Sequence, residues 1–150
     1  MASEEGIFLL LTGLSGAGKS TLACALKHLL REKSMPVVVL DGDVMRAGLC
    51  RDLGMSLADR QESARRVAEV GKVIVASGVA VIVSMIAPLK QSRMMMRDVV
   101  GLGAFKEIYI STPLAVCEQR DSKGLYKKAR LGSVKSLTDF DSPYEPPEDP

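Results

Sequence analysis

The 150-residue sequence has no tryptophan, 4% aromatic residues and a single histidine. Cys24, Cys50 and Cys117 are far apart and form no C-x-x-C motif, which favours free thiols in a reducing compartment over disulfides or a zinc site. The net charge of +2 is too small to indicate nucleic-acid binding. The chain lacks a run of about 18 apolar residues, and the apolar stretch after Glu5 lacks the basic flank of a signal peptide. We therefore expect a soluble cytoplasmic protein that binds neither nucleic acid nor a membrane.

Short apolar runs recur along the chain, as is typical of strands buried on both faces of a parallel sheet. The runs expected to form strands are 7–11, 37–40, 79–83 and 105–110. Apolar residues at helical spacing predict helices over 20–33, 60–77, 90–100 and 113–120. Asp59 and Glu62 have the spacing of a capping box, which predicts Asp59 as a helix cap. This alternation predicts an α/β fold with a doubly wound, mainly parallel sheet of four or five strands.

Residues 1–150 are expected to form a single domain with two distinct segments near its C-terminus. From Asp121 the apolar periodicity fades and lysines and arginines become frequent, so residues 121–135 are predicted to form a mobile basic lid. Residues 142–150 contain four of the seven prolines. This composition predicts an extended or disordered tail.

Residues 13–20 match the phosphate-binding pattern G-x-x-x-x-G-K-[ST] between an apolar strand and an amphipathic helix. The glycines allow backbone N–H groups to surround an anion at the positive end of the helix dipole. Lys19 can reach β- and γ-phosphates, and the Ser20 hydroxyl can ligate Mg²⁺. A glycine-rich turn without a ligand is the alternative, and the flanking elements weigh against it. The residues assigned to the nucleotide are Gly13, Leu14, Ser15, Gly16, Ala17, Gly18, Lys19, Ser20 and Thr21.

Asp41 and Asp43 follow the second expected strand, at the sheet edge where doubly wound folds bind ligands. The third strand, in contrast, is followed by no acid. A carboxylate at this edge can hold Mg²⁺ or accept a proton from an attacking hydroxyl. The other interpretation is a turn in which Asp43 caps a helix, and both can hold together.

Further motifs follow the phosphate-binding loop in collinear order. They are Leu40-Asp41-Gly42-Asp43 with Arg46, Asp52-Leu53-Gly54, Asp59-Arg60 with Glu62, Arg65-Arg66, Ala68-Glu69-Val70, Arg120-Asp121 with the segment 123–130, and Asp141 with Pro143-Tyr144-Glu145. Together with residues 13–21, these motifs resemble the adenylylsulfate kinase family, from Gly6 to about Pro146. A match of this length is far more specific than the phosphate-binding loop alone.

The resemblance implies transfer of the γ-phosphoryl group of MgATP to the ribose 3′-hydroxyl of adenosine 5′-phosphosulfate (APS), giving 3′-phosphoadenosine 5′-phosphosulfate. Lys19, Asp41 and Asp43 are the expected catalytic residues, and the sequence leaves open which aspartate is the base and which the metal ligand; the resemblance implies metal binding by Ser20 and Asp41. The substrate contacts that it implies come from Asp43, Arg46, Arg60, the Ile86 backbone and Lys123, with Met55, Ser63 and Leu137 at the pocket wall.

Some of these pocket positions depart from the family pattern. Met55 and Leu137 stand where the family usually has Phe, and Ser63 and Val44 where it usually has Asn. The two aromatic residues normally sandwich the substrate adenine, and a lost stacking face costs about 1–3 kcal/mol. We therefore expect weaker APS binding with the transfer machinery intact. Ala87 stands where many relatives have Ser, which favours direct in-line transfer over a phosphoserine intermediate.

Two other functions remain open from the sequence. The altered wall is compatible with a kinase for another small phosphorylated or sulfated alcohol, or with a non-catalytic ATP-binding module. Relatives also continue beyond the Pro-Tyr-Glu segment with another strand and a helix, so one sheet edge is expected to be bare. Either a second subunit covers this edge in a homodimer, or the chain is a shortened product.

Overall fold

A computed structural model describes residues 6–121, 123–132 and 144–148 of the chain. Its centre is a parallel sheet of four strands in the order β2-β3-β1-β4. The strands are β1 (Phe8–Thr12), β2 (Val37–Asp41), β3 (Ala80–Ser84) and β4 (Phe105–Tyr109). Each lies within one residue of its expected bounds. The predicted α/β class and parallel sheet are therefore confirmed.

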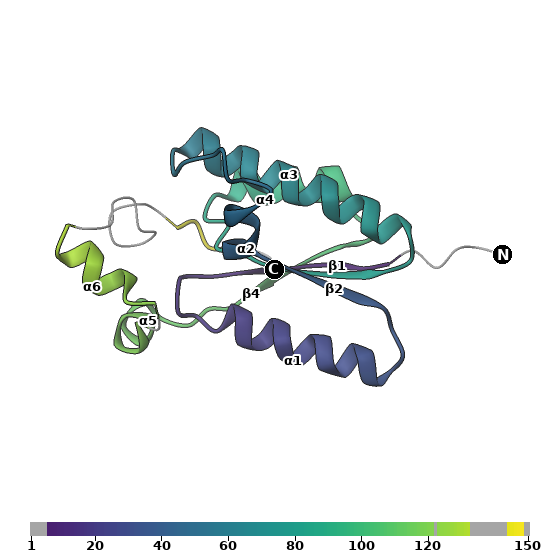
Figure 1. Ribbon diagram of the computed structural model, residues 1–150, viewed down its shortest axis with the longest axis horizontal. Helices are drawn as coiled ribbons and strands as arrows, with labels where there is room; N and C mark the ends of the chain where they lie inside the picture. Colours follow the sequence, from purple (N-terminus) through teal and green to yellow (C-terminus); the bar gives the residue numbers. More distant parts are fainter. Residues whose placement is uncertain (1–5, 122, 133–143, 149–150) are drawn as a thin grey trace.

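Helices cover both faces of the sheet. They are α1 (Lys19–Glu32), α2 (Gly42–Ala47), α3 (Leu57–Ala76), α4 (Lys90–Val100), α5 (Leu114–Arg120) and α6 (Leu125–Arg130). Figure 1 shows α1 on one side of the sheet, α3 and α4 on the other, and α5 and α6 beyond one end. This arrangement is the predicted doubly wound topology. Within the described residues, no helix has the length and apolar character needed to cross a membrane.

The central strands are buried on both faces, which explains their unbroken apolar runs. Leu10 packs in the cluster under α3 and α4, whereas its neighbour Leu11 packs in the cluster under α1. In the first cluster the rings of Phe8 and Phe105 stack at 5.5 Å between centroids. Helix α3 approaches this pair closely at Gly71, where a Cβ atom would lie 2.2 Å from a ring carbon of Phe8.

Two predicted helix caps are wrong. Ser56, rather than Asp59, caps α3, because its hydroxyl accepts a hydrogen bond from the Asp59 amide at 3.1 Å. The Asp59 carboxylate instead accepts from the Gly54 amide at 2.9 Å. At the end of β2, the side chain of Asp41 caps α2 and accepts from the Asp43 amide at 3.0 Å. Asp43 is therefore left free of the capping role.

Apolar spacing in the sequence predicts neither α2 nor α6. Each helix spans six residues, which is too short to show a clear apolar repeat. In α6 the frequent basic residues obscure the apolar pattern of two buried residues, Tyr126 at 1% and Ala129 at 7% exposure. These two pack against Leu14, Ala17 and Cys117. The described part of the basic segment is thus helical and lies on the phosphate-binding loop.

Candidate active site

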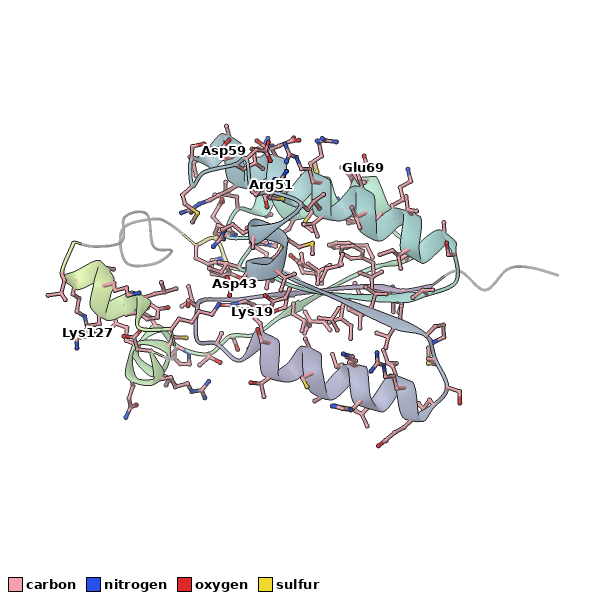
Figure 2. The ribbon with its side chains drawn as sticks, in the orientation of Figure 1. Lys19, Asp43, Arg51, Asp59, Glu69 and Lys127 are labelled. Carbon is pink, nitrogen blue, oxygen red and sulfur yellow. The ribbon has the colours of Figure 1, made fainter. Side chains whose placement is uncertain are left out.

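The carboxyl ends of β1, β2 and β3 meet at one edge of the sheet and border a cavity of about 810 Å³. Figure 2 shows Lys19 and Asp43 together at this edge. Most residues predicted for the site line the cavity: Ser15, Gly16, Gly18, Lys19, Ser20, Thr21, Asp41, Asp43, Arg46, Met55, Arg60, Ser63, Ile86 and Lys123. Gly13, Leu14 and Ala17 are buried and are not among its lining residues. Leu137 lies outside the described residues.

The phosphate-binding loop has the backbone geometry of an anion site. Gly16 and Gly18 have φ angles of 80° and 107°, a region that side-chain-bearing residues avoid. A Cβ at Gly16 would also lie 3.2 Å from the carbonyl oxygen of Cys117. Helix α1 starts after Gly18, and no side chain of the described residues caps it. Its first N–H groups are therefore available to an anion.

Three side chains that follow β4 in the sequence donate hydrogen bonds to carbonyl oxygens of the phosphate-binding loop. Thr112 donates to the Ala17 oxygen at 2.8 Å, and Arg120 donates to the Gly16 oxygen at 3.2 Å. The buried hydroxyl of Tyr126 donates to the Ser15 oxygen at 2.9 Å. Neither Thr112 nor Tyr126 has a role that the sequence alone predicts. Tyr126 lies within the 123–130 motif, and this motif was the only indication in the sequence that the residue is functional. Thr112 belongs to no motif.

Lys19 is folded back onto its own loop. Its ammonium group donates to the carbonyl oxygens of Gly13 at 2.8 Å and Leu14 at 2.7 Å. Burial and, to a smaller extent, the nearby charge of Lys123 together lower the pKa of Lys19 to about 8. An anion bound in the loop would favour the charged form and raise this pKa again.

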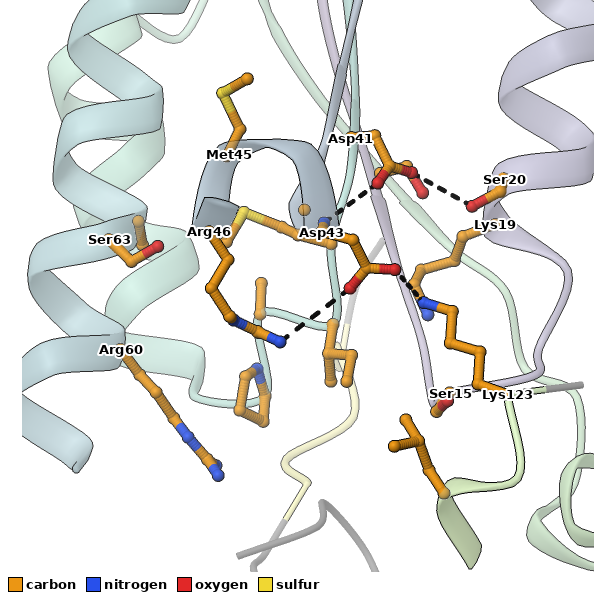
Figure 3. A pocket seen from close by; sticks show the side chains of 18 of the residues that line it. Ser15, Lys19, Ser20, Asp41, Asp43, Met45, Arg46, Arg60, Ser63 and Lys123 are labelled. Atoms are coloured by element: carbon orange, nitrogen blue, oxygen red, sulfur yellow. Dashed lines mark hydrogen bonds and ion pairs between the residues drawn. The ribbon is translucent and has the colours of Figure 1, made fainter. Parts of the chain in front are cut away.

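Asp41 uses both carboxylate oxygens. Oδ1 caps α2, and Oδ2 accepts a hydrogen bond from the Ser20 hydroxyl at 3.3 Å. Figure 3 shows this pair at the cavity wall. Two adjacent hard oxygen ligands fit Mg²⁺, which completes its coordination with water and substrate phosphates. The described residues contain no group of three or more His, Cys, Asp or Glu side chains that could hold a metal without a substrate.

Asp43 faces the cavity and contacts two cations. The Lys123 ammonium group donates to its Oδ2, and Arg46 Nη1 lies 3.9 Å from its Oδ1 (Figure 3). The hydrogen bond from Lys123 lowers the pKa of Asp43, so this carboxylate is a weak base. The contact joins the basic segment to the start of α2, across 80 residues of sequence.

The far wall of the cavity is formed by residues of α3 and the loop before it. Ser63 donates to the Cys50 sulfur at 3.4 Å, and Met55 is 42% exposed. Arg60 and Ser63 both extend from α3 toward the cavity in Figure 3. Val44, which we expected at or near the pocket, is 61% exposed and is not among the lining residues. Its side chain is exposed on α2, a helix that apolar spacing in the sequence did not predict.

Comparison with known proteins decides the family. The sequence pattern of adenylylsulphate kinases matches residues 5–150. The chain belongs to the adenylylsulfate kinase family. It is 51% identical over 147 residues to the adenylyl-sulfate kinase of Yersinia pestis, covering 98% of this chain and 69% of the relative.

Solved structures agree with this assignment. The APS kinase of Mycobacterium tuberculosis in complex with AMPPNP and APS is 44% identical, with a TM-score of 0.94 over 97% of this chain and 86% of that chain. A gluconokinase from Sinorhizobium meliloti is 17% identical, with a TM-score of 0.57 over 91% of this chain and 79% of that chain. The gluconokinase shares the fold alone. The predicted resemblance to adenylylsulfate kinases is thus confirmed.

Proposed function

We propose that the chain transfers the γ-phosphoryl group of ATP to the 3′-hydroxyl of APS. The supporting observation is that the phosphate-binding loop and both aspartates converge on one cavity. The M. tuberculosis family member, with the same fold and 44% identity, was solved with an ATP analogue and APS. The product would be 3′-phosphoadenosine 5′-phosphosulfate.

On the nucleotide side, the amides of residues 13–21 would hold the phosphates. Lys19 would exchange its contacts with the Gly13 and Leu14 carbonyl oxygens for the β- and γ-phosphates. Ser20 and Asp41 would hold Mg²⁺ against these phosphates. The metal would supply charge neutralisation of the transferring group.

On the acceptor side, Asp43 would orient the 3′-hydroxyl. Its lowered pKa makes it a weak proton acceptor, but phosphoryl transfer through a loose transition state depends mainly on positioning and charge. Arg46, Arg60 and Lys123 would contact the APS anions, and the Ile86 backbone would border the substrate. Lys123 would then leave Asp43 for the substrate as the basic segment closes.

Three features proposed for this chain are supported by the sequence alone. They are the single domain over 1–150, the lid role of 121–135 and the homodimer. In the described residues β4 pairs with β1 alone and β2 with β3 alone, so both sheet edges offer unpaired backbone groups. A second copy of the chain at one of these edges remains our proposal for the dimer.

The test is ADP release on addition of APS, measured with a coupled assay. Lys19→Ala should abolish it, since the transferring phosphoryl loses its ammonium partner, and Asp43→Ala should reduce it strongly. Asp41→Asn should keep the fold, because asparagine also caps helices, while the Mg²⁺ concentration needed for half-maximal rate rises. Lys72→Ala, on the exposed side of α3, is the matched control. Full activity in both Lys19→Ala and Asp43→Ala would overturn the assignment.

A second candidate function follows from Met55 and Ser63, which make the wall less specific for adenine. The acceptor would then be another small phosphorylated or sulfated alcohol. Screening such alcohols for ADP release separates the two candidates, and a strong preference for APS removes the second. Binding of MgATP without turnover on any acceptor would instead indicate a non-catalytic module.

A further inference from the structure

The loop after β3, residues 85–88, borders the acceptor side of the cavity. We call it the acceptor loop. Ala87 in this loop has a φ angle of 45°, in the left-handed region that costs free energy for a residue with a Cβ. Such a conformation persists where surrounding contacts enforce it. The contacts that hold this loop come from outside the cavity.

The first contact is a chain of two hydrogen bonds. The Thr12 hydroxyl donates its one proton to the carbonyl oxygen of Ile86 at 2.5 Å. The Tyr144 hydroxyl, 2.9 Å from the Thr12 oxygen, must therefore be the donor of the second bond. Burial raises the pKa of Tyr144, so the phenol keeps its proton. Bonds in series of this kind strengthen each other.

The second contact is the guanidinium group of Arg93, which is 3% exposed. Its Nη1 donates to the Ala87 oxygen at 2.7 Å and its Nη2 to the Glu145 oxygen at 2.5 Å, while Nε pairs with Glu107 at 2.7 Å. The Glu145 amide in turn donates to the Pro88 oxygen at 2.8 Å. Arg93 thus ties the acceptor loop to residues 144–145 with a rigid fork.

We propose that Tyr144, Thr12 and Arg93 are positioning residues for the acceptor. This inference rests on the proposed function, since it concerns how that site holds APS. None of the three side chains lines the cavity, so they act through the backbone of the acceptor loop. The carbonyl groups of the phosphate-binding loop are held by a different set, which includes Thr112 and Tyr126. Loss of the Tyr144 hydroxyl should therefore weaken APS binding and leave ATP binding unchanged.

The test compares Tyr144→Phe with a matched control, Tyr109→Phe. The two rings stack on each other at 5.8 Å, and the Tyr109 hydroxyl has no hydrogen-bond partner among the described residues. One net hydrogen bond corresponds to a change of about five- to tenfold in an equilibrium constant, so the KM for APS should rise by about this factor in Tyr144→Phe. The KM for ATP should stay within about twofold of the wild type, and Tyr109→Phe should leave both unchanged.

Variants of Thr12 give a rescue test of the same chain of bonds. Thr12→Ser keeps the hydroxyl and should retain the wild-type KM for APS. Thr12→Val removes it and should raise that KM. Equal rises in the KM for APS and for ATP, or an unchanged KM for APS in both Tyr144→Phe and Thr12→Val, would overturn the proposal.

Hydrogen exchange gives a readout that needs no turnover. The Glu145 amide should exchange faster in Tyr144→Phe than in Tyr109→Phe, because its acceptor, the Pro88 oxygen, is released with the loop. If the wild type shows no APS-dependent turnover, the proposed function fails, and this exchange result still decides whether Tyr144 holds the loop. Equal exchange in both variants would refute the positioning role.

Discussion

The lowered pKa of Lys19 predicts that the affinity for ATP falls as the pH rises through about 8. The ammonium group is the charge that the phosphates need, and burial together with Lys123 lowers its pKa to about 8 in the free protein. Bound phosphates favour the charged form, so binding raises this pKa. ATP binding is therefore coupled to proton uptake by Lys19. The affinity for ATP falls at pH values at which Lys19 of the free protein is already deprotonated.

The size of the effect follows from the protonated fraction. With the pKa of Lys19 at about 8, the charged form makes up about 91% at pH 7 and about 9% at pH 9. If the charged form alone binds, Kd for MgATP rises about tenfold between these pH values. At pH 8 about half a proton should be taken up per nucleotide bound.

Isothermal titration calorimetry measures both quantities. Kd is recorded from pH 7 to pH 9, and proton uptake is obtained from two buffers that differ in ionisation enthalpy. Lys19→Arg is the control, because its guanidinium group stays charged throughout this range. Any pH dependence of Kd that remains in this variant comes from groups other than residue 19, such as the nucleotide itself. In Lys123→Ala the midpoint should move to higher pH, since a neighbouring positive charge is gone.

Two other groups near Lys19 have pKa values shifted away from this window. Burial raises the pKa of the Cys117 thiol, and the pKa of Asp43 is lowered by Lys123. A Kd that is the same at pH 7 and pH 9, or an equal slope in Lys19→Arg, would refute the reasoning.

Two further substitutions test the packing and the acceptor wall. Gly71→Ala should destabilise the fold by about 1–2 kcal/mol, because the clash with the Phe8 ring costs up to about 3 kcal/mol and helix propensity returns roughly 1 kcal/mol. Thermal unfolding measures this loss; a melting temperature at or above that of the wild type contradicts it, and Phe8→Leu in the same chain should restore part of it. Met55→Phe should lower the KM for APS by about fivefold or more, since a stacking face is worth about 1–3 kcal/mol, whereas an unchanged KM would show that position 55 does not face the adenine.

The sequence predicted the strands well because each one is short, apolar and bounded by turns. Burial of neighbours such as Leu10 and Leu11 on opposite faces leaves a pattern that is visible without coordinates. The phosphate-binding loop and its flanks were likewise predictable, since spacing and residue type define them. The carboxyl ends of parallel strands meet at one edge, so the convergence of Lys19, Asp41 and Asp43 also followed from the predicted fold.

What could not be predicted depends on contacts between distant segments. Ser56 and Asp59 both have cap-forming side chains, and only the path of the loop before α3 decides which one caps the helix. The bond from Thr112 to the Ala17 oxygen spans 95 residues, and the Tyr144 bond to Thr12 spans 132. Periodicity and local motifs do not predict such pairs. They indicate which face of a helix or strand is buried, but not which residues pack against that face.

Asp41 ends a strand, starts a helix and faces Ser20 with its remaining oxygen. Asparagine can end the strand and cap the helix as well as aspartate does, but it offers no negatively charged oxygen beside Ser20 for the proposed Mg²⁺. A descendant of this chain that exchanged this one carboxylate for an amide would keep its shape while losing the carboxylate oxygen proposed to bind Mg²⁺. Overall structural likeness would not distinguish such an inactive descendant from a working enzyme, and inspection of this single position would.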